Sequence, residues 1–257
     1  MQWNATTYME FEAQRNIAII DLIQKVKPFL QKCESILDVG CGPANSTRLL
    51  AENFPNASLL GIDNSTSMLK KAKSLETTNC IFRFCDVNND LLKVRQKFDL
   101  IFANASLHWI HNQEKFFKEV LQLLEPSGVL AVQIPLDTTS LFHQTLQNLA
   151  KDFGLESKDI RAFYSLQRNE YYDILVQHFQ EVVLWESTYI HPLENIESIL
   201  RWYRGSGLRA YLEIVRDKEA FENELLKRLQ QQIQPQKNGN VLLAIPRLFF
   251  IAKKATT

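Results

Sequence analysis

The strongest structural signal in the chain is an alternation of short apolar runs with amphipathic segments between residues 33 and 136. We expect strands at the apolar runs, which lie at 35–39, 57–62, 79–84, 98–104 and 129–134. Between them, segments such as 45–54 and 113–124 carry apolar residues at helical spacing. Strands that alternate with helices build a parallel sheet covered on both faces, because each crossover needs a helix to return the chain. The sequence therefore predicts a doubly wound α/β fold.

The second half of the chain departs from this alternation, because helical patterns there are longer and separate only two strand-like segments. Pro246, inside the last apolar run, indicates an edge, a bulge or a break in that strand. We expect a mostly parallel, seven-stranded sheet with a helical cap at its carboxyl edge. The expected parts of this single domain are an N-terminal helical segment at 1–32, a core at 33–136, cap insertions at 137–178 and 192–238, and final strands at 179–191 and 239–254.

Composition limits the function classes. Twenty-nine basic residues balance 29 acidic ones, which argues against a nucleic-acid binder that neutralises many phosphates. Residues 1–15 lack the basic and apolar regions of a secretory signal, and no apolar run reaches the roughly 20 residues of a membrane span. The four cysteines fit buried thiols in a reducing compartment. We expect a cytoplasmic monomer with no nucleic-acid or membrane partner.

A glycine-containing turn is the most specific local motif. The segment ILDVGCGPANST, residues 36–47, places Gly40 and Gly42 between a strand and a helix. Glycine allows a sharp bend and a close approach to a ligand, and the helix N-terminus behind it can face polar groups. Asp63 ends the next strand, where an acidic side chain can accept both hydroxyls of a ribose. Together they predict a site for a nucleoside-containing cofactor, although Asn45 replaces the third glycine of a dinucleotide fingerprint.

ILDVGCGPANST resembles the first motif of the class I S-adenosylmethionine-dependent methyltransferases, and LLGIDNSTSML, FRFCDV and FDLIFANASLHWI resemble their next three motifs. The resemblance implies the Rossmann-like fold of that family, S-adenosyl-L-methionine as cofactor and S-adenosyl-L-homocysteine as product. It also implies cofactor contacts, which fall on Asp38 (orienting the glycine loop by accepting backbone N–H bonds), Gly40 and Gly42 (methionine moiety), Asp63 (ribose), Asn64 and Met68 (adenine faces), Asp86 and Val87 (adenine amino edge), and Asn104 (methionine moiety).

One position departs from that first motif, since Ala44 stands where the family usually has glycine. A positive φ is unfavourable for alanine, so we expect the turn to adopt an ordinary backbone region there. His108 and His111 show H-x-x-H spacing, but no acidic or cysteine partner stands near them in the sequence, and we assign no metal.

A longer resemblance covers nearly the whole chain. WNATTYMEFEAQR, FANASLHWI, WESTYIHPLENIESILRWYRGSGLRAYL and GNVLLAIPRLFFIAKK are similar to segments of the trans-aconitate 2-methyltransferase family. This resemblance implies methyl transfer to one carboxylate of a trans-aconitate-like polycarboxylic acid, which gives a monomethyl ester. The chain departs from the family's QMPDN at residues 133–137, where it reads QIPLD.

A carboxylate is ionised at neutral pH and needs no general base, but it does need planar cationic donors. Arg209 in the expected cap and Arg247 in the last strand do not belong to an obvious solvent-facing stripe, and we expect both to bind substrate. His108 and Trp109 follow the fourth strand, where methyl acceptors approach in this fold, and we expect them at the transfer site. We also expect Trp3 and Tyr8, from an N-terminal segment that continues to Arg15, to fold over the cofactor and line the substrate site.

Three alternatives remain open from the sequence alone. The first is carboxyl methylation of another acid, such as a malonyl thioester on a carrier protein or a fatty acid-like molecule. The second is methylation of a nitrogen or a phenolic oxygen, for which His108 is the candidate base. The third is a nonenzymatic protein that only binds S-adenosylmethionine.

Overall fold

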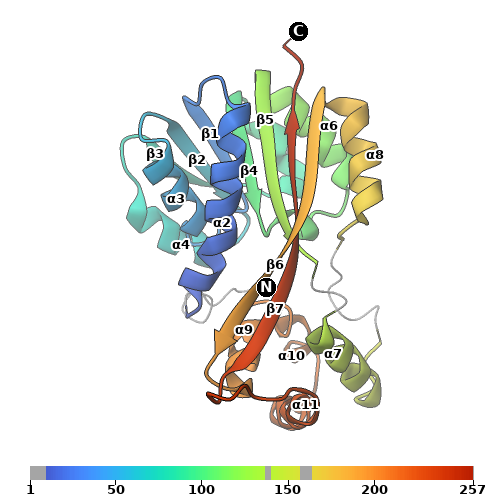
Figure 1. Ribbon diagram of the computed structural model, residues 1–257. Helices are drawn as coiled ribbons and strands as arrows, with labels where there is room; N and C mark the ends of the chain where they lie inside the picture. Colours follow the sequence, from blue (N-terminus) through green and yellow to red (C-terminus); the bar gives the residue numbers. More distant parts are fainter. Residues whose placement is uncertain (1–9, 137–139, 157–163, 257) are drawn as a thin grey trace.

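The computed structural model describes residues 10–136, 140–156 and 164–256. Its centre is a seven-stranded sheet of order β3-β2-β1-β4-β5-β7-β6 (Figure 1). The strands are β1 (Ser35–Val39), β2 (Ser58–Asp63), β3 (Cys80–Phe84), β4 (Phe98–Asn104), β5 (Leu124–Pro135), β6 (Glu181–Leu193) and β7 (Val241–Lys253). β1 to β5 run parallel and β7 is antiparallel to both of its neighbours. The predicted doubly wound, mostly parallel sheet is confirmed.

Helices cover both faces of the sheet. α2 (Glu12–Val26), α3 (Asn45–Asn53) and α4 (Thr66–Ala72) pack on one face, and α6 (Gln113–Leu123) and α8 (Arg168–His178) pack on the other. The central strands β1 and β4 are largely apolar because both of their faces are buried, and in β4 only the last residue is not buried. The strand order reverses at β1, which lies between β2 and β4. A crevice for a ligand forms outside the carboxyl ends of the strands at such a switch point.

β6 and β7 extend beyond the rest of the sheet. They pair from Glu181 to Leu193, whereas β5 pairs with β7 only as far as Arg247. Pro246 lies just past that last pair, so its missing N–H removes no bond to β5, and its carbonyl accepts a hydrogen bond from the N–H of Leu136 at 2.9 Å. The strand is continuous at Pro246, which marks the position where the sheet narrows to a two-stranded ribbon (Figure 1).

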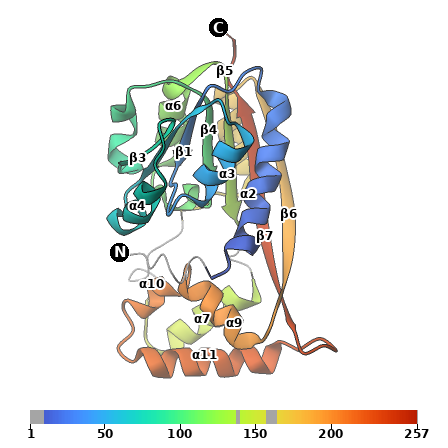
Figure 2. The same cartoon turned by 90° about the vertical axis from the view of Figure 1, so that its left-hand side faces the viewer.

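This ribbon leads to a cap beyond the carboxyl ends of the parallel strands (Figure 2). The cap helices are α7 (Leu141–Asp152), α9 (Ile196–Arg204), α10 (Arg209–Leu212) and α11 (Lys218–Gln232). Their apolar faces form a separate core in which Phe142 stacks on Tyr203 with ring centroids 3.6 Å apart. The cap therefore has a hydrophobic core of its own.

α8 is not part of the cap, and the prediction of a cap insertion across 137–178 is wrong for this helix. Tyr171 is fully buried against the sheet, with ring centroids 6.4 Å from Phe117 and 5.5 Å from Phe250. Its aromatic ring belongs to the core between α6, α8 and the sheet, and this contact holds α8 there.

In the part of the chain that the structure describes, none of the helices is long and apolar enough to cross a membrane.

Candidate active site

A cleft opens at the carboxyl ends of β1, β2 and β4, at the switch point of the sheet. Eight of the residues predicted from the sequence line this cleft together, namely Gly40, Gly42, Asp63, Asn64, Met68, Val87, Asn104 and Trp109. They come from separate strand ends and the loops that follow them. The cleft is thus assembled by the fold from short local motifs.

The two glycines of the turn meet different demands. Gly40 has φ of 72°, and a Cβ there would lie 2.4 Å from Cβ of Ser106, which follows β4. Gly42 has φ of 55°, and a Cβ there would meet nothing within 4 Å. Gly40 is therefore required for close packing of two loops. Gly42 is required by its backbone conformation, and its open side faces the cleft.

Ala44 does not adopt the ordinary backbone region that the sequence suggested. Its φ is 78° and its ψ is 24°, which is the left-handed region. The tight turn explains this strain, because the N–H of Ala44 donates to the carbonyl of Cys41 while its own carbonyl accepts from Arg48 in the first turn of α3. A left-handed alanine costs about 1 kcal/mol, which these contacts offset.

The resemblance predicted that Asp38 orients the glycine loop by accepting backbone N–H bonds. In the structure, Asp38 instead holds the start of α3. Its Oδ2 accepts hydrogen bonds from Ser46 Oγ and Thr47 Oγ1, each at 2.6 Å. The side chain is almost fully buried. Burial raises the pKa of Asp38 to about 6, and the two hydroxyl hydrogen bonds limit the rise. Asp38 thus positions the helix N-terminus behind the cleft.

Asp63 connects the two cofactor motifs. Its Oδ2 accepts from the N–H of Gly42 at 2.9 Å, and its Oδ1 accepts from the N–H of Ser65 at 2.7 Å. Burial raises its pKa above the ordinary value, while these backbone hydrogen bonds favour the ionised form. Each carboxylate oxygen has a further lone pair directed away from these bonds. Asp63 can therefore hold the glycine loop and still accept ligand hydroxyls in the cleft.

The apolar end of the cleft contains Met68 and Val87, with Asn64 beside them. Asp86 is placed differently, since the described residues that line the cleft include Asn88 but not Asp86. Asp86 caps the short helix α5 (Val87–Asp90), where Oδ1 accepts from the N–H of Asn88 at 3.3 Å. The third motif therefore contributes to the cleft through Cys85 and Val87, which flank Asp86 in the sequence.

Two buried amides face the other end of the cleft. Asn104 Oδ1 and Asn45 Nδ2 are both buried, and within residues 10–136, 140–156 and 164–256 neither has a hydrogen-bond partner. Leaving such atoms unsatisfied costs about 1–3 kcal/mol each. An acceptor and a donor in one cleft match the ammonium and carboxylate of an amino-acid moiety. These two orphaned atoms indicate a ligand with both groups.

His108 and Trp109, predicted at the transfer site, have different positions. Trp109 lines the cleft. His108 is 5% exposed and packs at a tilt against Trp109 with ring centroids 4.8 Å apart, and it is not among the described cleft-lining residues. Both belong to the short turn η4 (Leu107–Trp109), which presents only one of two successive rings to the cleft. Trp3 and Tyr8 lie outside the described residues.

Arg247 lies at the boundary between the sheet and the cap. It is 7% exposed, and its Nη1 donates to Gln133 Oε1 at 2.9 Å. Gln133 is the register partner of Asn104 on the neighbouring parallel strand. Arg209 lies in α10 of the cap, where its Nε donates to Glu213 Oε1 at 3.1 Å. The structure therefore places Arg247 beside β5, which separates it from the strand that carries Asn104, and places Arg209 on a separate cap helix.

Several cleft residues were not assigned to the site from the sequence. Arg15, in α2, lines the cleft, and its Nη2 donates to the carbonyl of Trp202 in the cap at 3.0 Å. Ser106 also lines the cleft, with Oγ donating to the carbonyl of Val39 at 2.6 Å. A polar residue directly after a buried strand is a usable signal for Ser106. Arg15 belongs to the N-terminal segment that the sequence predicted to fold over the cofactor, although it was given no contact of its own, and tertiary packing of α2 brings it to the cleft.

Comparisons with known proteins agree with this geometry. Residues 30–183 match the family model described as a methyltransferase domain. The chain is 35% identical over 254 residues to trans-aconitate 2-methyltransferases from Escherichia coli O45:K1 strain S88 and from Shigella flexneri, with 98% of each chain covered.

Solved structures share the fold. The YcgJ protein of Bacillus subtilis superposes with a TM-score of 0.62 at 14% identity, covering 93% of this chain and 99% of that one. Phosphoethanolamine N-methyltransferase 2 of Haemonchus contortus, solved in complex with S-adenosyl-L-methionine, gives a TM-score of 0.54 at 16% identity, covering 93% of this chain and 52% of that one.

The residues of the cleft fit S-adenosyl-L-methionine, which is the cofactor. The amide atoms of Asn45 and Asn104 match its amino-acid moiety, Asp63 matches its ribose, and the apolar end with Met68 matches its base. The matching family model spans more than half of the chain, and the full-length relatives are enzymes of the same kind. The chain belongs to the class I S-adenosylmethionine-dependent methyltransferases.

Proposed function

We propose that this enzyme transfers a methyl group to one carboxylate of a small polycarboxylic acid similar to trans-aconitate, giving a monomethyl ester and S-adenosylhomocysteine. The observation that carries the proposal is the buried guanidinium of Arg247, fixed by Gln133 at the edge of the methyl-transfer region. A buried guanidinium favours an anionic, planar partner. The similarity to trans-aconitate 2-methyltransferases supports the same acceptor class.

The path from the cofactor to Arg247 runs across the strands. Asn104 on β4 is the register partner of Gln133 on β5, and Pro135 on β5 is the partner of Arg247 on β7. Register partners on adjacent strands point to the same face. Asn104, Gln133 and Arg247 therefore form a polar line that runs from the cleft toward the cap. An acid held by Arg247 would have a carboxylate oxygen directed back to the cofactor.

The chemistry places few demands on the protein. The cofactor supplies an electrophilic methyl group on a sulfonium. A carboxylate with an ordinary pKa near 4 is already ionised at neutral pH, so no side chain has to remove a proton from it. The work of this chain is to hold the acid in line and to exclude water. Arg247 and Gln133 hold the acid in this proposal, and Trp109 forms the wall of the transfer site.

The proposed cofactor contacts lie along the cleft. Asp63 binds the ribose hydroxyls, and Asn64, Met68 and Val87 surround the adenine. Asn104 binds the methionine moiety, whose ammonium matches its free Oδ1. In the cap, Arg209 remains a second proposed contact for the acid, with Glu213 orienting its guanidinium.

A turnover screen tests the proposal. Purified enzyme is incubated with S-adenosylmethionine and a panel of di- and tricarboxylates, monocarboxylates, a malonyl-loaded carrier protein, amines and phenols, and methylated products are detected by mass. We expect monomethyl esters of small polycarboxylates, with trans-aconitate among them. The variant Asp63→Ala serves as the cofactor-site control, because Asp63 holds the glycine loop. Exclusive methylation of the carrier protein, an amine or a phenol would overturn the proposal.

A further inference from the structure

The boundary between the sheet and the cap contains a buried histidine that the proposed function does not yet use. His191 lies on the β6–β7 ribbon and is 3% exposed. Its Nε2 is buried and has no hydrogen-bond partner among the described residues. Leaving such an atom without a partner costs about 1–3 kcal/mol. An unsatisfied imidazole nitrogen in a buried polar region points to a ligand.

A tryptophan of the cap connects His191 to the cofactor cleft. The ring of His191 stacks on Trp202 of α9, with centroids 5.1 Å apart and an angle of 27°. The guanidinium of Arg15 lies 4.7 Å from the centroid of the same Trp202 ring system, and Arg15 lines the cleft. Trp202 therefore contacts both residues. His191 and Arg15 therefore meet at one ring of the cap, where the cap contacts the cleft.

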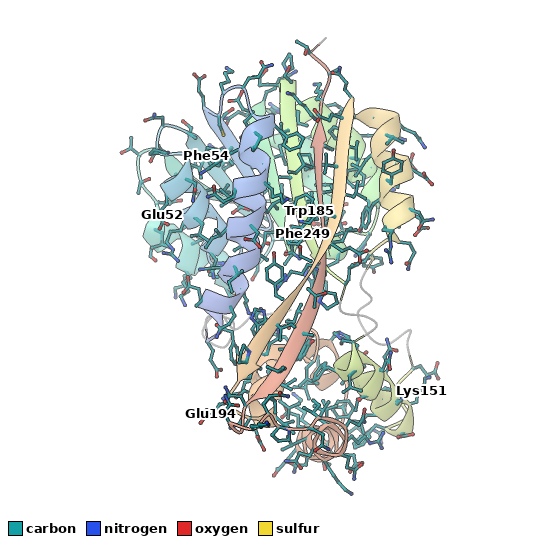
Figure 3. All side chains as sticks on the ribbon, viewed as in Figure 1. Glu52, Phe54, Lys151, Trp185, Glu194 and Phe249 are labelled. Carbon is teal, nitrogen blue, oxygen red and sulfur yellow. The ribbon has the colours of Figure 1, made fainter. Side chains whose placement is uncertain are left out.

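The ribbon places His191 and Arg247 on the same face. Residues alternate along a strand, so Tyr189 and His191 share the face of Ser187, which is the register partner of Arg247. The guanidinium of Arg247 lies 5.9 Å from the ring of Tyr189, and that ring stacks toward His191 with centroids 6.4 Å apart. The same face continues to the stacked pair of Trp185 and Phe249 (Figure 3). The junction thus has cations on two sides of His191.

The charges around His191 favour its neutral form. Burial, with the added positive charges of Arg247 on β7 and Arg15 on α2, lowers the pKa of His191 to about 4. On its own strand, Tyr189 donates to Asp21 Oδ2 at 2.6 Å, so that carboxylate is engaged by the phenol. A neutral imidazole can donate one N–H to an anion, and the anion would in turn favour protonation of the ring.

This arrangement places two groups of buried hydrogen-bond donors at the boundary between the sheet and the cap. Gln133 Nε2, which is buried and without a hydrogen-bond partner in the described ranges, lies with Arg247. His191, with its unpartnered Nε2, lies on the same face of the ribbon and shares the ring of Trp202 with Arg15. Each group suits one carboxylate. A monocarboxylate can satisfy only one of them.

We propose that His191 binds a second, non-reacting carboxylate of the acceptor and thereby makes the enzyme select polycarboxylates over monocarboxylates. This inference rests on the proposed function, because it assumes that the acceptor is an acid held by Arg247. It assigns to His191 a role in specificity rather than in the methyl-transfer step. The expected signature is a loss of acceptor binding without a loss of cofactor binding.

Binding by calorimetry tests this role without relying on turnover. The acid is titrated into the complex with S-adenosylhomocysteine, using trans-aconitate and a monocarboxylate, crotonate. We expect His191→Phe to raise the Kd for trans-aconitate about tenfold or more, and to leave the Kd for crotonate within about twofold. His191→Gln keeps an N–H donor and should recover most of the binding. Unchanged thermal midpoints and an unchanged Kd for S-adenosylhomocysteine show that the variants are folded.

A second measurement detects the proton that His191 should take up when the acid binds. Trans-aconitate binding near pH 6 is repeated in buffers with different ionisation enthalpies, which reports protons taken up on binding. We expect proton uptake in the unaltered enzyme and its loss in both His191→Phe and His191→Gln, because a bound carboxylate favours the protonated ring.

The outcomes separate the two proposals. An enzyme that binds S-adenosylhomocysteine but neither binds nor methylates any polycarboxylate would overturn the proposed function. An enzyme that methylates polycarboxylates, and whose His191→Phe variant binds both acids equally well or equally poorly, would overturn only the role of His191. If crotonate does not bind the unaltered enzyme measurably, proton uptake decides, and equal uptake in enzyme and variants overturns the inference.

Discussion

Asn104 and Gln133 are register partners on the neighbouring parallel strands β4 and β5, so a residue of the cofactor cleft lies beside the residue that fixes Arg247. The N–H of Ala105 also donates to the carbonyl of Gln133 at 2.9 Å, which keeps the two strand ends together. This pairing joins the methyl-donor end of the cleft to the proposed acid site through rigid backbone. Substitutions on its two sides should therefore separate cofactor binding from acid binding.

Asp63→Ala should raise the Kd for S-adenosylhomocysteine at least about tenfold, on the order of 1.4 kcal/mol, because it removes both the proposed ribose contact and the anchor of the glycine loop. Calorimetric titration measures the effect. Glu52→Ala is the matched control, since Glu52 is exposed on α3, pairs with Arg48 away from the cleft, and its loss should change the Kd less than about threefold. An unchanged Kd in Asp63→Ala would remove Asp63 from the site, and an equal rise in Glu52→Ala would show that the loss is not specific to the site.

Arg247→Ala should raise the KM for the acid at least about tenfold and leave the Kd for S-adenosylhomocysteine unchanged. Arg247→Lys should also bind the acid less tightly, because an ammonium cannot reproduce the planar fork of the guanidinium. Arg204→Ala is the control, as Arg204 pairs with Glu222 on the cap surface. The same assay on Arg209→Ala decides whether this cap residue contacts the acid. Equal losses of acid and cofactor binding in Arg247→Ala would indicate misfolding instead.

The rate at saturating substrate should stay flat between about pH 6 and 8, because a carboxylate with a pKa near 4 is fully ionised across this range. Initial rates at intervals of pH measure this, with the enzyme checked for stability at each value. A steep rise with pH would indicate an acceptor that must lose a proton to a base.

His191 should make the free energy of unfolding depend on pH. Its pKa is about 4 in the folded protein and 6.5 in the unfolded chain, so the unfolded chain binds more protons between these values. The contribution of His191 to the free energy of unfolding is complete above about pH 6.5 and is lost as the pH falls toward 4. At 1.4 kcal/mol per pKa unit, the loss between pH 7 and 5 is about 2 kcal/mol. Urea unfolding at both pH values measures it.

His191→Gln should remove this part of the pH dependence, and His111→Gln, at an exposed position, is the matched control. If the difference in unfolding free energy between pH 7 and 5 is the same in His191→Gln as in the unaltered protein, the low pKa of His191 is refuted.

Ala44→Gly should stabilise the protein by about 0.5–1 kcal/mol, since glycine adopts the left-handed backbone of this turn without strain. Ala51→Gly is the control, because Ala51 lies inside α3, where glycine should destabilise by about 1 kcal/mol. Urea unfolding of both variants measures the difference. Destabilisation in both would show that the left-handed alanine at position 44 carries no strain.

The sequence by itself determined the elements whose signals are local. The apolar run at 35–39 became β1 and that at 98–104 became β4 with the expected bounds, because strands buried on both faces must be continuously apolar. The positions of Gly40, Gly42 and Asp63 at the cleft could also be predicted, since positive φ and an acid at a strand end are properties of single positions. The resemblance to the methyltransferase motifs added Asn64, Met68 and Val87, which line the cleft.

Tertiary structure decided the rest. Asp38 bonds to hydroxyls of α3, α8 packs on the sheet through Tyr171, and the ring of His108 is buried against that of Trp109. None of these side-chain placements follows from the local sequence pattern. Arg247 and Gln133 are 114 positions apart, and they meet because β7 inserts beside β5 in one particular register. A shift of that register by one residue would turn Arg247 to the opposite face. The sequence therefore predicted the cofactor cleft, and only the folded sheet placed Arg247 against Gln133, the register partner of the cleft residue Asn104.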